Sequence, residues 1–173
     1  MDGGRRYAHS MAVNWLDPEE QTAWRTIIHV HSRLLGRLDA ELQGCHGMSL
    51  PDYEVLVHLS EAPGHHLRMA ELAERLSLSP SGLTRRLDGL VREGLVERRA
   101  CPSDRRGSLA VLTPTGFAAL QEAAPTHVNG VRRYLIDRLE RDQLFELAAA
   151  FDSVGQALDE AQPQRLAARS RTT

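Results

Sequence analysis

The chain has 173 residues, of which 42% are hydrophobic and 25% charged, as in an ordinary globular domain with a sizeable core. Its formal net charge of −2 excludes a protein that coats nucleic acid without selectivity. No apolar run approaches the roughly 20 residues that cross a bilayer, and no apolar segment follows Arg5 and Arg6 as a secretory signal would require. We therefore expect a cytoplasmic protein with no membrane partner.

The basic charge is gathered in one segment. All 21 basic residues are Arg, a side chain suited to forked contacts with phosphate and guanine. Residues 17 to 62 contain three Arg and eight Asp or Glu, whereas residues 81 to 106 contain seven Arg and four Asp or Glu. This distribution predicts a nucleic-acid-binding face in the second segment.

A long helix is predicted after an N-terminal arm, residues 1–16, that has little periodic signal. Asp17 is a suitable N-cap, Pro18 suits the first helical position, and Glu20 stands where a capping box places its acid. Apolar residues then recur every three or four positions until Gly44, where we expect the helix to stop. About 26 residues is long for a globular helix, which favours packing against a partner chain.

Two further helices and a tight turn follow. Ser49 can cap a helix that ends at Pro63 and Gly64, and a short helix is predicted from Met69 to Leu76. Ser79 and Pro80 can then restart the chain as N-cap and first-turn residue.

The helix after Ser79 has two different faces. Leu83, Leu87, Leu90 and Val91 form an apolar stripe, and Gly94 ends the helix. The opposite side presents Ser81, Thr84, Arg85 and Arg86. Small side chains and forked cations at an exposed helix start can approach a DNA groove closely and meet phosphates and base edges.

A β-hairpin and two more helices complete the chain. Residues 95–99 and 109–112 are predicted strands, joined by an Arg-rich turn over 102–107. Arg at the tip of a projecting hairpin suits a narrow minor groove, and Asp104 can orient a neighbouring guanidinium. Thr113 and Pro114 start the next helix, in which Pro125 predicts a kink or a break, and a final helix carries apolar residues from Leu144 to Leu158.

Five segments in a fixed order carry a family resemblance: Leu50–Leu56, Met69–Ala73, Leu87–Arg98, Asp104–Gly107 and Leu112–Gly116. In arrangement and spacing they resemble the MarR (multiple antibiotic resistance regulator) family of bacterial transcription factors, and the flanking helices extend the resemblance to residues 17–161. The fold class implied is mainly α with a small β-hairpin. A winged helix-turn-helix would span 49–113, flanked by helical dimerisation regions at 17–48 and 114–161 and a flexible tail at 162–173.

The resemblance implies a homodimer whose two winged heads meet successive major grooves of a pseudo-palindromic double-stranded DNA site. The recognition helix would run from Pro80 to Glu93, and Asp104 would orient Arg106 into the minor groove. Many relatives are released from DNA by small, often aromatic or acidic, effector molecules bound between dimer helices and heads. The residues expected to contact DNA are Arg68, Ser79, Ser81, Gly82, Thr84, Arg85, Arg86, Arg98, Asp104, Arg105 and Arg106.

The effector pocket has weaker candidates. The polar or aromatic residues nearest the expected crevice are Trp24, His31, Arg33, Arg37 and His58. Trp24 could equally well be part of a dimer core, and the Arg residues could equally well lie on a solvent-exposed helix face.

Other chemistries find less support in the sequence. Cys101, just before the wing tip, could be a redox switch because nearby Arg lowers a thiol pKa, but a small residue ending a strand is the simpler reading. His29 and His31 point to different helix faces, so we expect no metal site and no cofactor. No catalytic pattern appears, so the chain is not expected to be an enzyme. The alternatives left open are a redox- or metal-responsive regulator of the same fold and a winged-helix protein-interaction module.

Overall fold

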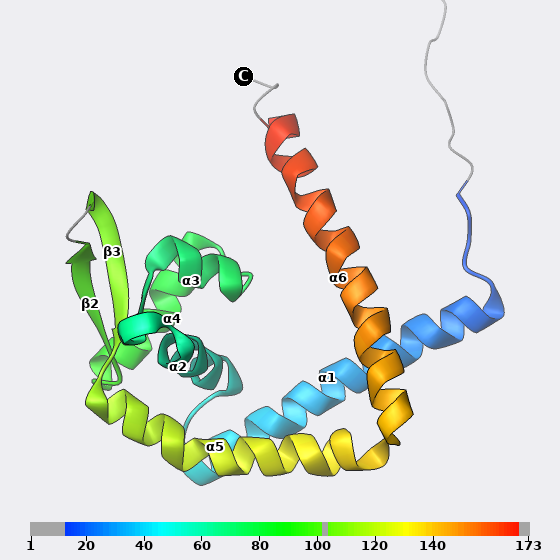
Figure 1. Ribbon diagram of the computed structural model, residues 1–173, viewed down its shortest axis with the longest axis horizontal. Coiled ribbons are helices and arrows are strands. Elements are labelled where there is room, and N and C mark those ends of the chain that lie inside the picture. Colours follow the sequence, from blue (N-terminus) through cyan, green and yellow to red (C-terminus); the bar gives the residue numbers. More distant parts are fainter. Residues whose placement is uncertain (1–12, 102–103, 170–173) are drawn as a thin grey trace, which may run out of the picture. The chain divides into compact units, whose positions relative to one another are not determined.

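The computed structural model describes residues 13–101 and 104–169, and their side chains except at 104–106 and 161–169. It is mainly helical with one small antiparallel sheet, which confirms the predicted fold class (Figure 1). The helices are α1 (Pro18–His46), α2 (Leu50–Glu61), α3 (Met69–Arg75), α4 (Pro80–Arg92), α5 (Pro114–Tyr134) and α6 (Arg141–Arg169). The strands are β1 (His66–Arg68), β2 (Val96–Cys101) and β3 (Asp104–Leu112). Single 3₁₀ turns lie at Pro63–His65 and Ile136–Arg138.

The chain divides into two units, one ending at Gly36 and the other beginning at Arg37, so the boundary falls within α1. The first unit contains the start of α1, and the predicted capping box is confirmed there. Asp17 Oδ1 accepts hydrogen bonds from the backbone N–H of Glu19 and Glu20, and Asp17 N–H donates to Glu20 Oε2 at 2.8 Å. These bonds satisfy helix-start donors that have no partner within the helix.

The C-terminal end of α1 lies later than predicted. Gly44 does not stop the helix, which continues to His46. The chain leaves the helix at Gly47, which has φ +65°, a left-handed conformation that glycine adopts without a Cβ penalty. A glycine inside a helix costs only about 1 kcal/mol relative to alanine, so Gly44 alone does not end it.

Three N-caps position the second unit, and all three were predicted. Ser49 accepts from the N–H of Asp52, Ser79 from Gly82 at 3.1 Å, and Thr113 from Gly116 at 2.9 Å. A proline stands in the first turn of each capped helix. The starts of α2, α4 and α5 are therefore fixed by local sequence.

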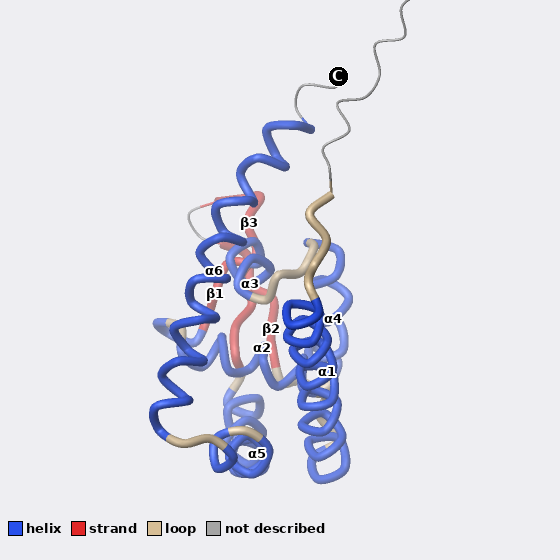
Figure 2. Tube along the Cα trace, turned by 90° about the vertical axis from the view of Figure 1, so that its right-hand side faces the viewer, coloured by secondary structure: helices blue, strands red, loops and turns tan. Residues whose placement is uncertain are grey.

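The sheet has the strand order β1-β3-β2, and Figure 2 shows the three strands together. Leu67 lies opposite Ala110 and Val96 opposite Leu112, and all four are buried. They meet a core of leucines from three helices, which is the main apolar cluster of the second unit. Its fully buried members include Leu56, Leu59, Leu72, Leu83, Leu87 and Leu90.

The wing, which is the hairpin of β2 and β3, differs from the prediction in two ways. The predicted hairpin has a third strand, β1, on the far side of β3. The hairpin strands are also longer than predicted, because β2 reaches Cys101 and β3 begins at Asp104. Residues 102 and 103, within the predicted turn, lie outside the described residues.

The last two helices exclude the expected break at Pro125, whereas the expected kink and the flexibility of the tail stay predictions. α5 continues without a break through Pro125, although proline removes one helical hydrogen bond. Leu120 and Ala123, just before the proline, are buried, so packing holds this part of the helix in place. α6 runs to Arg169, well into the range predicted to be a flexible tail, and residues 170–173 and 1–12 lie outside the described residues. The assignment of dimerisation regions remains a prediction.

Candidate nucleic-acid interface

Helix α4 is buried on one face and exposed on the other. Leu83, Leu87 and Leu90 recur every three or four residues and are buried, which orients the helix on the core. On the other side Ser81, Thr84 and Arg85 are exposed. Arg85 forms no ion pair with any other residue that the structure describes. The prediction that these three side chains share an open face is consistent with the geometry.

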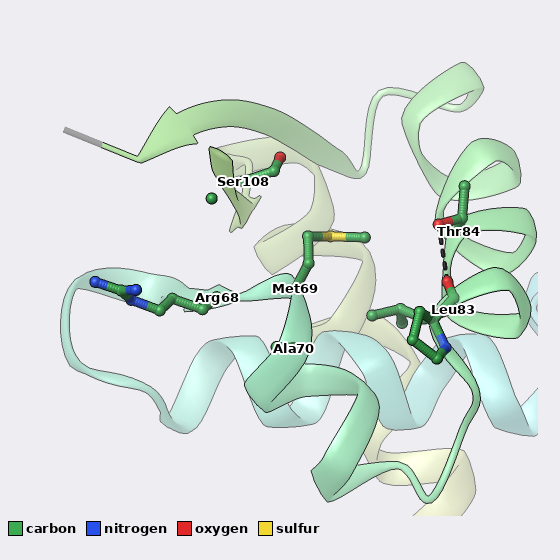
Figure 3. Close-up of a pocket in the computed structure, with 8 residues that line it drawn as sticks. Arg68, Met69, Ala70, Leu83, Thr84 and Ser108 are labelled. Atoms are coloured by element: carbon green, nitrogen blue, oxygen red, sulfur yellow. Dashed lines mark hydrogen bonds between the residues drawn. The ribbon is translucent and has the colours of Figure 1, made fainter. Parts of the chain in front are cut away.

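A groove of about 380 Å³ lies beside the start of α4 (Figure 3). Met69 and Ala70 of α3, Leu83 and Thr84 of α4, and Ser108 of β3 line it, so it separates the helix-turn-helix from the wing. The Thr84 hydroxyl donates to the carbonyl of Pro80 at 2.9 Å, as the dashed line in Figure 3 marks. Arg68, at the end of β1, is exposed, and its side chain points away from Thr84 (Figure 3).

Arg86 does not lie on this open face, contrary to the prediction. Its Nη1 lies 3.4 Å from Oδ1 of Asp52 on α2, its side chain is only 28% exposed, and its Nε is buried without a hydrogen-bond partner. The residue directly precedes Leu87, so it stands at the edge of the buried stripe. Arg86 therefore joins α4 to α2, and we leave it out of the proposed DNA contacts.

Arg98 is also held by other groups of the protein. It stands on β2, and its Nη2 donates to the carbonyl oxygen of Thr84 at 2.8 Å. Its Nη1 lies 2.8 Å from Oδ1 of Asp88. Arg98 therefore links β2 to α4, and its predicted contact with DNA stays a prediction.

The predicted wing-tip contacts concern side chains outside the described residues. These are Asp104, Arg105 and Arg106, whose backbone belongs to β3. Their role in the minor groove stays a prediction. Two other predicted contact residues lie at the start of α4 as expected: Ser79 is its N-cap, and Gly82 is in its first turn.

The predicted effector residues are distributed over both units. Trp24 (56% exposed), His31 and Arg33 lie in the first unit, where Arg33 Nη1 is 3.5 Å from His29 Nε2. His58 is half-buried on α2 in the second unit. None of the five candidates lines the groove beside α4 or the second groove described below. The effector pocket stays a prediction.

The fifth candidate, Arg37, belongs to a polar cluster that sequence reasoning missed. Arg37 Nε donates to the hydroxyl of Tyr134 at 3.2 Å, and that hydroxyl donates to Glu41. The hydrogen bond that Arg37 donates to Tyr134, with the charges of Tyr134 and Glu41 nearby, raises the pKa of Arg37. Arg133 also reaches Glu41, at 3.6 Å. Nothing in the sequence pattern pairs residues so far apart.

A second missed contact lies between α2 and α5. The rings of Tyr53 and His127 are 4.7 Å apart, and His127 Nδ1 is buried without a hydrogen-bond partner. Burial lowers the pKa of His127, while the carboxylate of Glu54 opposes that shift. Burial also raises the pKa of Tyr53.

Cys101 is buried at the end of β2. It lines a second groove, of about 520 Å³, together with Arg68 and Arg75. Arg98 and Arg99, expected to lower its pKa, are instead paired with Asp88 and Glu97. Burial and these pairings weaken the case for a redox switch.

Two further features of the described residues concern metal binding and membranes. Among the residues whose side chains the structure describes, no three His, Cys, Asp or Glu are grouped so that they could hold a metal ion. Over residues 13–101 and 104–169, no helix has the length and apolar character needed to cross a membrane.

Comparisons with known proteins agree on one family. The MarR family profile matches residues 46–107. AbsC, a MarR family transcriptional regulator from Streptomyces coelicolor, is 40% identical with a TM-score of 0.82, over 86% of this chain and 99% of that chain. Sco3205, a MarR family regulator from the same organism solved in complex with DNA, is 39% identical with a TM-score of 0.82, over 84% of this chain and 92% of that one.

A curated relative matches over a shorter stretch. The HTH-type transcriptional repressor YetL from Bacillus subtilis is 35% identical over 85 residues, or 49% of this chain. The matched segment spans about half of that relative, 51% of its length.

Proposed function

This chain belongs to the MarR family of DNA-binding transcriptional regulators, and we propose that it is a homodimeric repressor of a pseudo-palindromic operator, released by a small molecule. It acts in the cytoplasm and is not an enzyme. The observation that carries the proposal is the open face of α4. There Ser81, Thr84 and Arg85 stand exposed above a buried leucine stripe.

The DNA contacts proposed for this face follow from its chemistry. Arg85 carries a planar fork of donors that fits the O6 and N7 acceptors of guanine or a phosphate. Ser81 and Thr84 are small enough to let the helix approach base edges, and the positive end of the α4 helix dipole favours phosphate. Arg106, oriented by Asp104, would enter the adjacent minor groove.

Dimerisation is proposed from two apolar faces, each considered by itself. On α1, Trp24, Ile27 and Ile28 are each at least 45% exposed. On α6, Phe151, Val154 and Leu158 recur every three or four residues and are 51%, 54% and 65% exposed. Soluble monomers rarely leave such contiguous apolar surface in water, which supports a second copy as the partner. Two heads would then bind half-sites about 34 Å apart, one turn of DNA.

Regulation by an effector is proposed on weaker support. Arg37 and His58 are polar groups of the second unit, and Trp24, His31 and Arg33 of the first. Each is a side chain of a kind that can bind an aromatic or acidic molecule. Binding of such a molecule would change the spacing of the two heads and so lower the affinity for DNA.

The test begins with a pool of random-sequence duplexes from which the wild-type protein selects its site. The selected duplex is then titrated with Arg85→Ala and, as a matched control, Arg92→Ala, which removes the same charge from the last turn of α4. Arg85→Ala should lose about ten- to hundredfold in affinity and relax the base preference at one position. Arg92→Ala should keep the wild-type preference. Selection of no sequence by the wild-type protein would overturn the proposal.

A further inference from the structure

The guanidinium of Arg98 forks across one turn of the recognition helix. One terminal nitrogen donates to the backbone carbonyl of Thr84 and the other pairs with the carboxylate of Asp88, both at 2.8 Å. We propose that Arg98, held by Asp88, is a positioning residue: it fixes the wing against α4 in the arrangement that reads DNA. The inference rests on the DNA binding proposed above and assigns these two residues a role within it.

The geometry distinguishes this role from a phosphate contact. Both terminal nitrogens of Arg98 are engaged by α4, and the side chain is only 33% exposed. If Arg98 swung away from α4 toward a phosphate, it would lose one or both of these hydrogen bonds. The planar fork also has little freedom to turn while both bonds are kept.

Asp88 supplies a second and independent argument. Its side chain is 49% exposed, on the face of α4 that also carries Thr84 and Arg85. A carboxylate in that position repels the phosphates of an approaching duplex. The negative charge of Asp88 disfavours DNA binding. Its ion pair with Arg98, at 2.8 Å, gives a reason for an acid at this position, because the pair holds the Arg98 side chain in place.

The position of the link explains why the wing needs it. β2 follows α4 through a tight turn at Gly94, which has φ +73°, and Val96 is the buried residue that anchors the strand. Arg98 comes two residues later on β2, the strand that forms the wing hairpin with β3 (Figure 1). The next residue, Arg99, pairs with Glu97 on its own strand and gives no such link.

The expected loss of DNA affinity follows from the fraction of molecules in which the wing is held against α4. If one charged hydrogen bond holds the wing, losing it lowers that fraction about tenfold, and the apparent affinity for DNA falls by the same factor. Affinity should fall without loss of a phosphate contact. The salt dependence of binding should therefore keep its slope, whereas removal of one phosphate contact would lower the slope by about 0.9.

The decisive variant is Asp88→Asn, titrated against the duplex that the wild-type protein selects. Removing a negative charge from the DNA-facing side should tighten binding if only charge matters. If the Asp88–Arg98 pair positions the wing, the affinity of Asp88→Asn for the duplex should instead fall about tenfold, with an unchanged salt slope. Equal or tighter binding by Asp88→Asn would sink the proposal. Because the wild-type protein binds the duplex in that case, the outcome is distinct from a failure of the proposed function.

Substitutions of Arg98 provide the matched series. Arg98→Ala should weaken binding about tenfold with unchanged salt slope, whereas Arg99→Ala, which removes the same charge from the next residue, should change affinity less than about threefold. Arg98→Lys keeps the charge but cannot fork, so its affinity should lie between those of wild type and Arg98→Ala. Two results would overturn the inference and identify Arg98 as a phosphate contact. One is wild-type DNA affinity in Arg98→Lys, and the other is a salt slope lowered by about 0.9 in Arg98→Ala. Thermal melting checks that each variant is folded.

Discussion

Gly116, in the first turn of α5, packs directly against the backbone carbonyl of Leu95, between α4 and β2. A Cβ at position 116 would overlap the carbonyl oxygen of Leu95 and come within 2.9 Å of its carbon and of Leu112 Cδ1. The neighbouring Thr113 hydroxyl donates to the same Leu95 carbonyl at 3.1 Å. The start of α5 is thus seated on the root of the wing through backbone contact, which leaves no room for a side chain.

Gly116→Ala should therefore destabilise the protein. Backbone cannot move aside as a flexible side chain can, so we expect the free energy of unfolding to fall by about 1–3 kcal/mol. Urea denaturation measures it. Gly89→Ala is the control, because nothing lies within 4 Å of a Cβ there and alanine favours the helix interior. Equal stability of Gly116→Ala and wild type would show that the α5 start can shift away from Leu95.

Phe151→Glu should dissociate the proposed dimer. Phe151 is exposed on α6, and burial of a Phe side chain stabilises an interface by about 1.5–3 kcal/mol, twice over in a two-fold dimer. The dimer dissociation constant should rise on the order of a hundredfold or more. Sedimentation equilibrium measures it. Gln156→Glu adds the same charge to the same helix at an exposed polar position and should leave the dimer intact. An unchanged dimer in Phe151→Glu would exclude this face of α6 from the interface.

Helix starts were predictable from sequence because a cap is a local interaction. Ser49, Ser79 and Thr113 each bond an N–H three residues on, so the pattern contains both partners. The three residues of β1 are too few to show a period of two, and their partners in β3 lie more than forty residues later. The sequence therefore indicated a hairpin where a three-stranded sheet forms.

The sequence predicted which face of α4 is exposed, but not which residues its arginines contact within the protein. The leucine stripe of α4 identifies the exposed side, and Ser81, Thr84 and Arg85 lie there. The partners of Arg86 and Arg98 within the protein could not be predicted, because they are set by tertiary packing. Arg86 meets an acid of α2, and Arg98 meets a helix turn only because the wing folds back onto α4.

Arg106→Ala should abolish specific operator binding while leaving the dimer intact. The expectation comes from the Asp-x-Arg pattern of the wing, since arginine is drawn to the negative potential of a narrow minor groove. Affinity for the selected duplex should fall at least tenfold, toward the affinity for a scrambled duplex. A gel-shift titration measures it, with sedimentation as the check on assembly. Unchanged affinity would remove the wing tip from the mechanism.

The half-buried imidazole of His127 should make stability depend on pH. Burial lowers the pKa of His127 in the folded protein below its ordinary value of 6.5, although Glu54 opposes the shift. Below 6.5 the unfolded chain then binds more protons at this site than the folded chain does, so the free energy of unfolding falls as pH falls toward the folded pKa. Above 6.5 both states carry a neutral imidazole and the contribution is constant.

His127→Phe isolates this contribution, because phenylalanine can keep the ring contact with Tyr53 but cannot take up a proton. Urea denaturation at about pH 7.5 and about pH 5.5 gives the loss of stability for each protein. Wild type should lose more than His127→Phe, since every other titrating group is common to both. His46→Phe is a useful control, because His46 is exposed, with its Nε2 2.8 Å from Thr126 Oγ1. The same pH dependence in wild type and His127→Phe would mean that the imidazole takes up a proton as readily in the folded protein as in the unfolded chain.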